Sequence, residues 1–234
     1  MKLSIIIPVF NEEKTILEVV KNVVSISIPK VLKEIVIVDD GSTDSTVKKL
    51  KSIKNIKIIY HNINKGKGAA VKTGIKNSSG EYILIQDADL EYNPKYIKNL
   101  TLPIINDQAT VVYGTRIKRM PDFSKEERTI QFLIHYFGNR FLSLFTSILY
   151  GQWITDMETG YKLFPKKALK NIKLNSKGFE FEPEITSKLL KQKFKIMEIP
   201  ISVNPRGYNE GKKINTLKDG SKAFWYLLKY RFTN

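Results

Sequence analysis

The first half of the chain alternates between short apolar runs and segments with helical periodicity. The apolar runs are KLSIIIPVF, EIVIVDD, IKIIY, EYILIQDAD and TVVYGTR, all between residues 2 and 116. Between the first two runs, Ile16, Val19, Val20 and Val23 recur at intervals of three and four positions, which predicts a helix. Continuous apolar strands that alternate with helices predict an α/β fold, with a mostly parallel sheet covered on both faces.

The same reading predicts the remaining elements. In the first half we expect further helices around Val47 and Leu50, over residues 68–78 and over Pro94–Ile105. In the second half the pattern predicts helices over residues 124–150, 183–191 and 216–232, and short strands at 161–164 and 194–203. No linker, internal repeat or low-complexity segment interrupts these elements. We therefore expect a single domain over residues 1–234.

Polar side chains follow four of the predicted strands at the points where the strands end. These residues are Asn11 and Glu12, Asp39 and Asp40, Asp87 and Asp89, and Arg116. In open parallel sheets, ligands bind at the carboxyl ends of the strands, next to a switch in strand order. We therefore expect these side chains to form one site.

Asp87 and Asp89 are the most specific pair in this set. At positions i and i+2 of a strand, two side chains share a face, and two adjacent carboxylates repel unless a positive charge lies between them. Hard oxygen ligands favour Mg²⁺ or Mn²⁺, and such a cation also binds diphosphate. The alternative is a pair of solvated turn aspartates ahead of Asn93-Pro94. The glycine-rich residues 64–70 open a helix, where they form either a phosphate-binding loop or an ordinary one.

Composition and charge exclude several classes of protein. The chain is 42% hydrophobic, enough for a sizeable core, and it has no cysteine, which excludes disulfides and thiolate metal sites. His61 and His135 are too far apart in sequence to suggest a His-rich zinc site. The net charge of +16 favours anionic partners, although scattered lysines also suit a plain solvated surface. We expect no nucleic-acid partner because no recognition motif is present.

Nucleotide-binding motifs of other folds are missing. The first strand is followed by NEEKT, without the glycines of a dinucleotide-binding turn, and the P-loop pattern is absent as well.

Seven motifs together resemble family 2 glycosyltransferases. In chain order they are SIIIPVFNEEKTI, EIVIVDDGSTDST, NKGKGAAVKTGI, GEYILIQDADLE, GTR, TDMETGYKLF and GFEFEPEI. The chain is most similar to the dolichol-phosphate mannose synthase branch, which transfers a sugar from a nucleotide to a polyprenyl phosphate. The resemblance extends from Ser4 to about Arg231. It implies a GT-A (Rossmann-like) fold in which residues 1–120 bind the nucleotide sugar and residues 121–234 bind the acceptor.

The resemblance also implies roles for individual residues. The nucleotide-sugar site would contain Pro8, Asn11, Glu12, Asp39, Asp40, Lys67, Asp87 and Arg206. A Mg²⁺ or Mn²⁺ ion would be bound by Asp87, Asp89 and Glu91, the last at a position where the synthases often have glutamine.

Arg116 and Arg140 match positions that hold the lipid phosphate in the synthases, and Arg206 matches a loop that closes over the diphosphate. Arginine suits these tasks because its planar fork binds phosphate oxygens in pairs, and the alternative for each arginine is a surface ion pair.

The resemblance places Asp89, Asp156 and Arg116 at the reaction centre. A hydroxyl acceptor needs a general base, which Asp156 would supply, whereas a polyprenyl phosphate is already ionised. With a polyprenyl phosphate as the acceptor, Asp156 would instead orient Lys162 or the sugar. Glu180 and Glu182 either contact sugar hydroxyls or form a carboxylate-rich helix start.

Three functions that involve nucleotide sugars remain open from the sequence, and nucleic-acid binding through the net charge of +16 is a fourth, weaker hypothesis. The first is transfer of a sugar from a GDP-mannose or UDP-glucose type of donor to a polyprenyl or dolichyl phosphate, by metal-assisted inverting displacement. The second is transfer to a soluble glycan or protein, with Asp156 as base. The third is a nucleotide-sugar-binding or scaffolding protein without turnover, against which the intact Asp87, Asp89 and Arg116 argue.

The longest late stretch without charge, Phe141–Thr155, has 15 residues, fewer than the roughly 20 needed to span a membrane. Ile130–Tyr150 and Ala223–Phe232 combine aromatic and basic residues, which suits helices at a membrane interface, core packing or a dimer face. We expect peripheral binding at the cytoplasmic face of a membrane, with a membrane partner protein or a homo-oligomer as further options.

Overall fold

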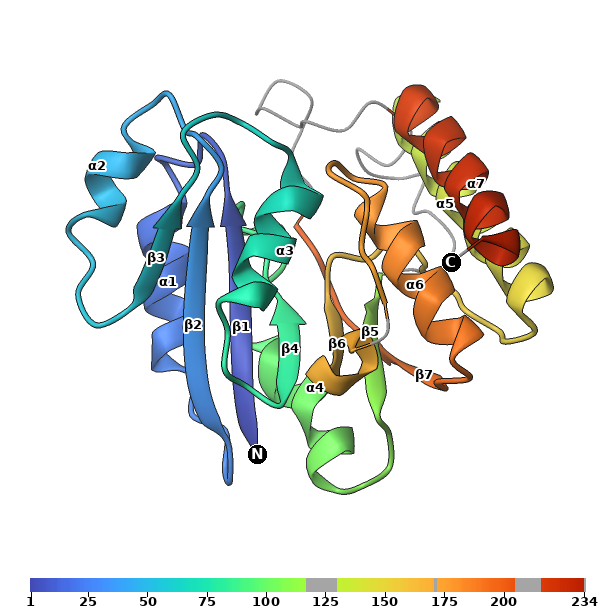
Figure 1. Cartoon of the computed structure of the whole chain (residues 1–234), viewed down its shortest axis with the longest axis horizontal. Coiled ribbons are helices and arrows are strands. Elements are labelled where there is room, and N and C mark those ends of the chain that lie inside the picture. Colours follow the sequence, from blue (N-terminus) through green and yellow to red (C-terminus); the bar gives the residue numbers. More distant parts are fainter. Residues whose placement is uncertain (117–129, 171, 205–215, 234) are drawn as a thin grey trace.

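The computed structural model describes residues 1–116, 130–170, 172–204 and 216–233. Within them lies a seven-stranded sheet of order β3-β2-β1-β4-β6-β5-β7 (Figure 1). Its strands are β1 (Lys2–Val9), β2 (Leu32–Asp39), β3 (Lys57–Tyr60), β4 (Tyr82–Ile85), β5 (Val111–Thr115), β6 (Lys162–Pro165) and β7 (Ile196–Pro200). The β6 strand is antiparallel to both β4 and β5, and the other neighbouring pairs are parallel. The predicted mostly parallel α/β sheet is confirmed.

The helices follow the predicted periodicity. They are α1 (Ile16–Ser25), α2 (Thr46–Leu50), α3 (Lys67–Lys76), α4 (Tyr96–Ile105), α5 (Ile130–Tyr150), α6 (Phe181–Lys191) and α7 (Thr216–Phe232), with a 3₁₀ turn at Lys166–Leu169. The expected start of the fifth helix at residue 124 lies outside the described residues.

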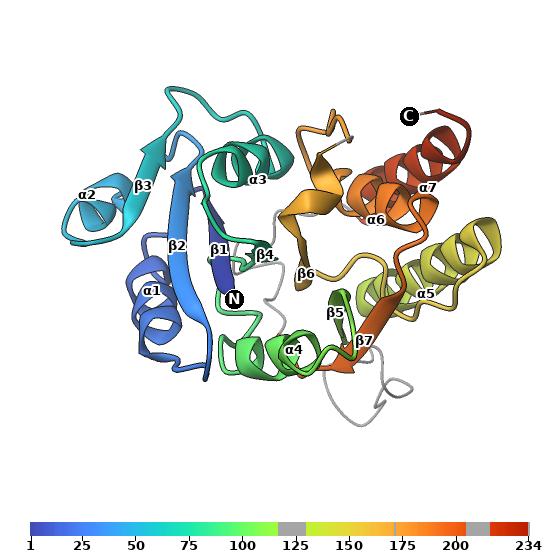
Figure 2. The same cartoon turned by 60° about the horizontal axis from the view of Figure 1, so that its bottom comes forward.

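Alternation along the central strand creates two cores. Ile6 faces one side of β1 and packs with residues of α3 and α6, whereas Ile5 and Ile7 face the other side and pack with residues of α1 and α4. Figure 2 shows these helix pairs on opposite faces of the sheet. Burying one such side chain contributes about 1.5–3 kcal/mol, so the sheet and its two helical layers form a rigid support.

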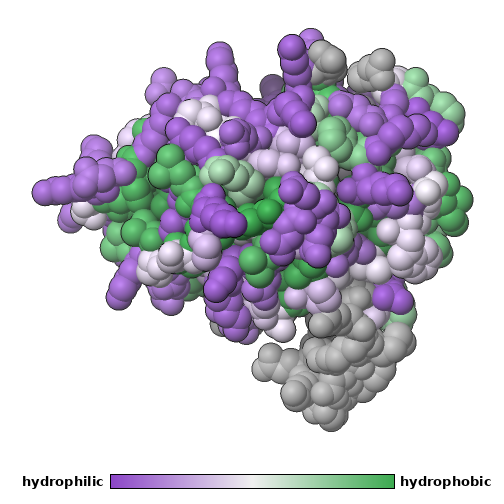
Figure 3. All heavy atoms as spheres, turned by 90° about the horizontal axis from the view of Figure 1, so that it is seen from below, coloured by the Kyte–Doolittle hydropathy of each residue, from purple (hydrophilic) through white to green (hydrophobic). Residues whose placement is uncertain are grey.

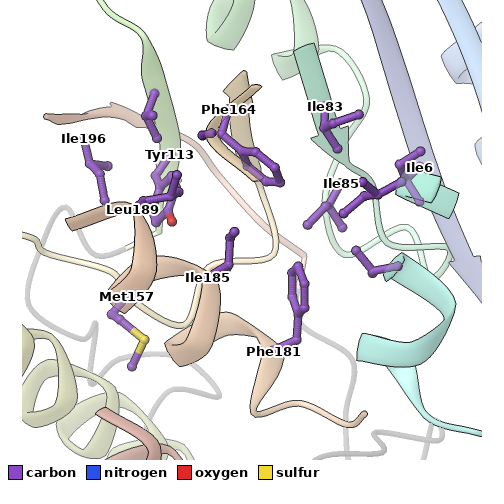
Figure 4. Packing of buried hydrophobic residues seen from close by; sticks show 14 of the residues in the cluster. Ile6, Ile83, Ile85, Tyr113, Met157, Phe164, Phe181, Ile185, Leu189 and Ile196 are labelled. Carbon is purple, nitrogen blue, oxygen red and sulfur yellow. The ribbon is translucent and has the colours of Figure 1, made fainter. Parts of the chain in front are cut away.

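The α6 helix lies directly against the second half of the sheet. Phe181 and Ile185 project from α6 toward the strands that carry Ile83, Ile85 and Phe164 (Figure 4). The start of α6 is thereby held close to the end of β4.

The α5 and α7 helices pack against each other at one side of the molecule (Figure 1). The rings of Phe145 and Phe224 lie 4.5 Å apart, and the Tyr150 hydroxyl donates to the Leu227 carbonyl at 2.8 Å. Figure 3 looks toward the amino ends of the strands, where hydrophilic side chains project from most of the face. Hydrophobic side chains show between them at the left and in the centre of the view, and also at its right-hand edge, on the side of α5 and α7.

The topology brings distant segments to one edge of the sheet. The chain leaves β1 for β2 and β3 on one side, and β4 then pairs with the other side of β1, which is the strand-order switch where α/β sheets bind ligands. Because β6 is antiparallel, it starts at the edge where β4 and β5 end. The segment before β6, which carries Asp156, therefore joins the carboxyl edge of the parallel strands.

Candidate active site at the carboxyl edge of the sheet

The segments that follow β1 and β2 are bonded to each other. Asn11 adopts a left-handed backbone conformation (φ 51°), and its N–H donates to the Ser42 hydroxyl at 2.9 Å. Its side-chain oxygen accepts the Thr43 N–H at 2.8 Å, and the Glu12 N–H donates to the Thr46 hydroxyl at 2.9 Å. Asn11 and Glu12 therefore shape the site partly by fixing the loop after β2, and Pro8 lies just before them in β1.

Asp39 and Asp40, which follow each other at the end of β2, have different surroundings. The Asp40 carboxylate accepts the Gly66 N–H at 2.7 Å and the Lys65 N–H at 3.1 Å, and it lies 2.6 Å from His61 Nδ1. Asp40 thus anchors the glycine-rich loop. Asp39 is buried, and its Oδ1 has no hydrogen-bond partner among the described residues. Asp39 rather than Asp40 keeps an acceptor oxygen available for a ligand.

The loop anchored by Asp40 leads into α3, whose first residue is Lys67. The Lys67 ammonium lies 2.8 Å from Asp87 Oδ1 and 2.9 Å from Glu182 Oε1, so it joins the end of β4 to the start of α6. Burial by itself would lower the pKa of Lys67, but the two carboxylates outweigh it and raise the pKa well above its ordinary value. Lys67 is therefore a permanent cation in the site.

The turn after β4 presents Asp87, Asp89 and Glu91. Leu90 takes a left-handed conformation (φ 63°), and Asp89 Oδ1 accepts the Glu91 N–H at 3.1 Å. Beneath the turn, the Gln86 side-chain amide donates to the Asp87 carbonyl at 2.9 Å. No group of three or more His, Cys, Asp or Glu side chains within the described parts of the chain is arranged to hold a metal ion by itself.

Arg116 and Asp156 form a buried two-pronged ion pair. Arg116 Nε and Nη2 donate to the two Asp156 oxygens at 2.7 and 2.8 Å, and the Arg116 N–H adds a bond of 2.9 Å. The side-chain amide of Asn139 donates a fourth bond at 3.0 Å. Burial would raise the pKa of Asp156, but the Arg116 charge and these bonds outweigh it and lower the pKa. This carboxylate is a weak base.

Polar residues of α5 hold the Asp156 segment in place. The Ser143 hydroxyl accepts the Met157 N–H at 3.0 Å and the Ser147 hydroxyl accepts the Ile154 N–H at 2.9 Å, in addition to the Asn139 bond to Asp156. These three residues were not predicted from the sequence. A signal was available, because Asn139, Ser143 and Ser147 recur at intervals of four along an otherwise apolar helix.

Glu198 of β7 supports the same segment from another side and was also not predicted. Its carboxylate accepts the Thr155 N–H at 2.9 Å and the Asp156 N–H at 3.0 Å. Burial raises the pKa of Glu198. The backbone around Asp156 is therefore positioned by α5 and β7 together.

Lys162 does not have the role that the sequence suggested, in which Asp156 would orient it. Its ammonium is fully buried, donates to the carbonyls of Met157 and Thr159, and lies 4.7 Å from the centre of the Tyr113 ring. Burial lowers the pKa of Lys162 to about 8. Asp156 contacts Arg116 and Asn139, and Lys162 instead fixes the turn that follows Asp156.

The other predicted residues are spread more widely. Glu182 is buried against Lys67, whereas Glu180 accepts the N–H groups of Lys177 and Gly178 at 3.1 and 3.0 Å, so the two have different roles. Arg140 is exposed next to Asn139 on α5, with its guanidinium 5.9 Å from the Tyr136 ring. Arg206 lies outside the described residues.

Gly160 sits where the Asp156 segment touches the turn after β4. A Cβ atom at this position would lie 2.3 Å from Asp87 Oδ2 and 3.1 Å from the Tyr92 ring, and the Gly160 N–H donates to the Tyr92 hydroxyl at 2.8 Å. The close approach therefore requires glycine.

Replacing Gly160 by alanine should displace Asp87 from Lys67. The loss of one charge-assisted contact is worth about 1.5–3 kcal/mol, so we expect a roughly tenfold or larger fall in kcat/KM for the nucleotide sugar that the motif resemblance implies. Gly138→Ala in α5 is the matched control, since nothing lies within 4 Å of its Cβ position. Equal kinetics for the two variants would contradict this role of Gly160.

Comparison with known proteins identifies the family. Residues 4–173 match the family described as Glycosyl transferase family 2. The chain belongs to this family. This family 2 glycosyltransferase is 34% identical to UDP-N-acetylglucosamine--dolichyl-phosphate N-acetylglucosaminyltransferase of Methanococcus voltae, over 96% of this chain and 94% of that protein.

One more distant relative agrees with this result, and one solved structure shares the fold. The glycosyltransferase is 28% identical to Dolichol-phosphate mannosyltransferase of Pyrococcus furiosus, over 98% of this chain and 64% of that protein. Its fold matches glucosyl-3-phosphoglycerate synthase of Mycobacterium tuberculosis, solved with Mn²⁺, UDP and phosphoglyceric acid, with a TM-score of 0.74 and 16% identity over 100% of this chain and 79% of that one. The resemblance drawn from the motifs, the GT-A fold and the enzymatic class are confirmed.

Proposed function

We propose that this glycosyltransferase transfers a sugar from a nucleotide sugar to a polyprenyl phosphate such as dolichyl phosphate. The observation that carries the proposal is the buried pair of Arg116 and Asp156. A carboxylate with a lowered pKa and four bound donors is poorly suited to deprotonate a hydroxyl, and a phosphate acceptor needs no such base. The names of the relatives from Methanococcus voltae and Pyrococcus furiosus support the same acceptor.

In this proposal Arg116 also binds the acceptor phosphate. Asp156 uses two of the five N–H donors of the guanidinium, so donors remain for an anion at the partly exposed tip. Arg140 lies one residue from Asn139, which binds the same Asp156, and so belongs to the same region. A phosphate oxygen held here would attack the anomeric carbon as the bond to the nucleoside diphosphate breaks, which inverts the anomeric configuration.

The nucleotide would lie across the ends of β1, β2 and β4. The partnerless Asp39 oxygen is a ready acceptor for an N–H of a base or a ribose hydroxyl. Asp40 and Lys67 keep the glycine-rich loop and the start of α3 next to the diphosphate position. The donor is of the GDP-mannose or UDP-glucose type, and the M. voltae relative is named for a UDP sugar.

The carboxylates after β4 fit a divalent cation shared with the donor. Mg²⁺ is usually held by one or two carboxylates together with substrate phosphates, so the absence of a three-residue cage among the described residues suits a cation that arrives with the diphosphate. Asp89 and Asp87 would hold it, with Glu91 in the same turn. Mg²⁺ or Mn²⁺ would neutralise charge on the departing diphosphate.

A polyprenyl phosphate lies in a membrane, so an enzyme that uses it as acceptor must bind a membrane surface. Apolar side chains on α5 and α7 are strongly exposed, including Phe141 at 57%, Ile148 at 75% and Trp225 at 63%, while Lys222, Lys229 and Arg231 lie along α7. Aromatic and basic residues on one helical surface suit a headgroup layer. Among the described helices, none combines the length and apolarity needed to cross a membrane. Peripheral binding at the cytoplasmic face follows as part of the proposal.

Vesicle binding tests this surface. Replacing Phe141 and Ile148 by serine should weaken binding to vesicles that contain anionic lipid by roughly a hundredfold or more, since each of the two side chains contributes about 1.5–3 kcal/mol when buried and each 1.36 kcal/mol is a factor of about ten. Leu32→Ser, at the amino end of β2 and 66% exposed, is the control. If the double variant bound vesicles as well as the unchanged protein does, the assignment of this surface to membrane binding would be contradicted. The surface would then be a dimer face or a binding site for a partner protein, and light scattering on the purified protein distinguishes the two.

The function itself is tested by transfer assays. Purified protein with Mg²⁺ or Mn²⁺ is given UDP- and GDP-sugars, with dolichyl phosphate in one series and soluble glycans or peptides in another. We expect glycosyl transfer to the lipid phosphate alone. Equal turnover with a soluble acceptor would overturn the proposal in favour of a hydroxyl acceptor.

A further inference from the structure

Two buried carboxyl groups beside the Arg116–Asp156 pair each keep one oxygen without a partner. They belong to Glu158, in the segment before β6, and Glu182, in the first turn of α6, and the oxygens are Glu158 Oε1 and Glu182 Oε2. Glu182 is only 3% exposed. Leaving such a group unsatisfied is unfavourable, so a buried acceptor of this kind in an active site is explained best by a ligand that donates to it.

Among the residues that the structure describes, the cations nearby do not form a hydrogen bond with either of these two oxygens. Lys67 binds Glu182 through Oε1, and its other carboxylate contact is Asp87. Lys162 donates to the carbonyls of Met157 and Thr159. These bonds hold the two chain segments in position while the free oxygens of Glu158 and Glu182 are left open.

Two further polar atoms in the same region also lack partners within the described chain. They are the hydroxyl of Thr159, which is fully buried next to Glu158, and Oδ1 of Asn139, whose amide nitrogen is bound to Asp156. Three of the four unsatisfied atoms can only accept hydrogen bonds. A ligand for this group must therefore carry several donors.

The two carboxyl groups also influence each other. Burial raises the pKa of Glu158 to about 7, and the charge of Glu182 is the next largest cause. Such proximity of like charges is tolerable when neutral hydroxyl or amide groups lie between them, and it would repel another carboxylate.

We propose that Glu158 and Glu182 bind the sugar ring of the donor by accepting hydrogen bonds from its hydroxyl or acetamido N–H groups. The pair selects a neutral hexose or N-acetylhexosamine and excludes a uronic acid, whose carboxylate would lie against both glutamates. The inference rests on the nucleotide-sugar donor of the proposed function and is independent of the acceptor. A metal ion is a weaker occupant, because the cations Lys67, Lys162 and Arg116 act on the same carboxylates.

The test compares sugar binding with nucleotide binding. Affinities for UDP-N-acetylglucosamine and UDP, and for GDP-mannose and GDP, are measured by calorimetry for the unchanged protein and for Glu158→Ala. We expect the affinity for the preferred nucleotide sugar to fall roughly ten- to hundredfold with an unchanged affinity for its nucleoside diphosphate. A deoxy-sugar analogue that lacks the contacted hydroxyl should lose affinity for the unchanged protein but none further for the variant. UDP-glucuronate should bind no better than UDP.

The conservative variants Glu158→Gln and Glu182→Gln keep side-chain volume and guard against a folding effect. Glu18→Gln, on the exposed face of α1, is the control. The inference would be overturned if the variants lost affinity for the nucleotide sugar and for the nucleoside diphosphate to the same extent, or if UDP-glucuronate bound tightly. A loss of affinity that appears only with Mn²⁺ present would also overturn it, because that result would indicate a metal site. Failure of the unchanged protein to bind any nucleotide sugar would refute the donor assignment itself. Donor binding without transfer to dolichyl phosphate would refute only the acceptor.

Discussion

Turnover by the Asp89→Ala variant is expected to fall roughly a thousandfold, because a cation that stabilises the leaving diphosphate contributes several kcal/mol and each 1.36 kcal/mol is a factor of about ten. Asp89 stands at the carboxyl end of β4, in a turn fixed by Leu90 and by the bond from the Glu91 N–H. The measurement is the initial rate of sugar transfer at saturating donor, over a titration of Mn²⁺. The unchanged enzyme should show metal-dependent turnover that chelation removes.

Glu18→Ala, exposed on α1, controls for general effects of removing a carboxylate and should keep the full rate. Thermal melting of both variants establishes that they are folded. Asp89→Ala turnover close to that of the unchanged enzyme would remove the metal assignment.

Asp156→Asn is expected to lower the free energy of unfolding by about 3–5 kcal/mol, because it leaves the Arg116 charge buried without its partner. The pair is bidentate, and Asp156 is fully buried. Urea unfolding measures the loss. Removing both charges, as in Arg116→Gln combined with Asp156→Asn, should restore part of the stability. If Asp156→Asn alone were as stable as the unchanged protein, the stabilising role of the Arg116–Asp156 pair would be contradicted.

The pH dependence of stability follows from the same pair. The folded-state pKa of Asp156 is lower than its ordinary value of 3.8, so its contribution is complete above that value and is lost as the pH falls through the folded pKa. The difference in unfolding free energy between the unchanged protein and Asp156→Asn should therefore be constant near neutral pH and shrink below about pH 4. A difference that grew on acidification would have the wrong sign.

Hydrophobic periodicity was sufficient to predict the order of strands and helices along the chain. It could not predict that β6 runs antiparallel between β4 and β5, because a strand of only four residues, Lys162–Pro165, carries no information on its direction. The orientation depends on which neighbours remain unpaired when the chain returns from α5.

The strand ends predicted that these polar side chains would lie at one edge of the sheet, but they did not predict which partners each side chain would have there. Asp39 and Asp40 look equivalent in the sequence, yet consecutive side chains point to opposite sides, and only Asp39 keeps a free oxygen. The contact of Lys67 with Glu182 joins residues 115 positions apart and has no local signature. Glu158 was overlooked because its significance comes from burial beside Glu182, which only the packed structure reveals.

The position of β6 also has a consequence for synthesis of the chain on the ribosome. The strands β1, β2, β3 and β4 can pair as soon as they emerge, whereas both neighbours of β5 come later in the sequence. Val111–Thr115 therefore waits as an unpaired hydrophobic segment until residues 162–165 have been made, and a waiting segment of this kind is prone to misassociation. Arg116, at the end of that strand, meets Asp156 only at this stage, so the nascent chain completes the paired strands β1 to β4 before it can form the Arg116–Asp156 ion pair.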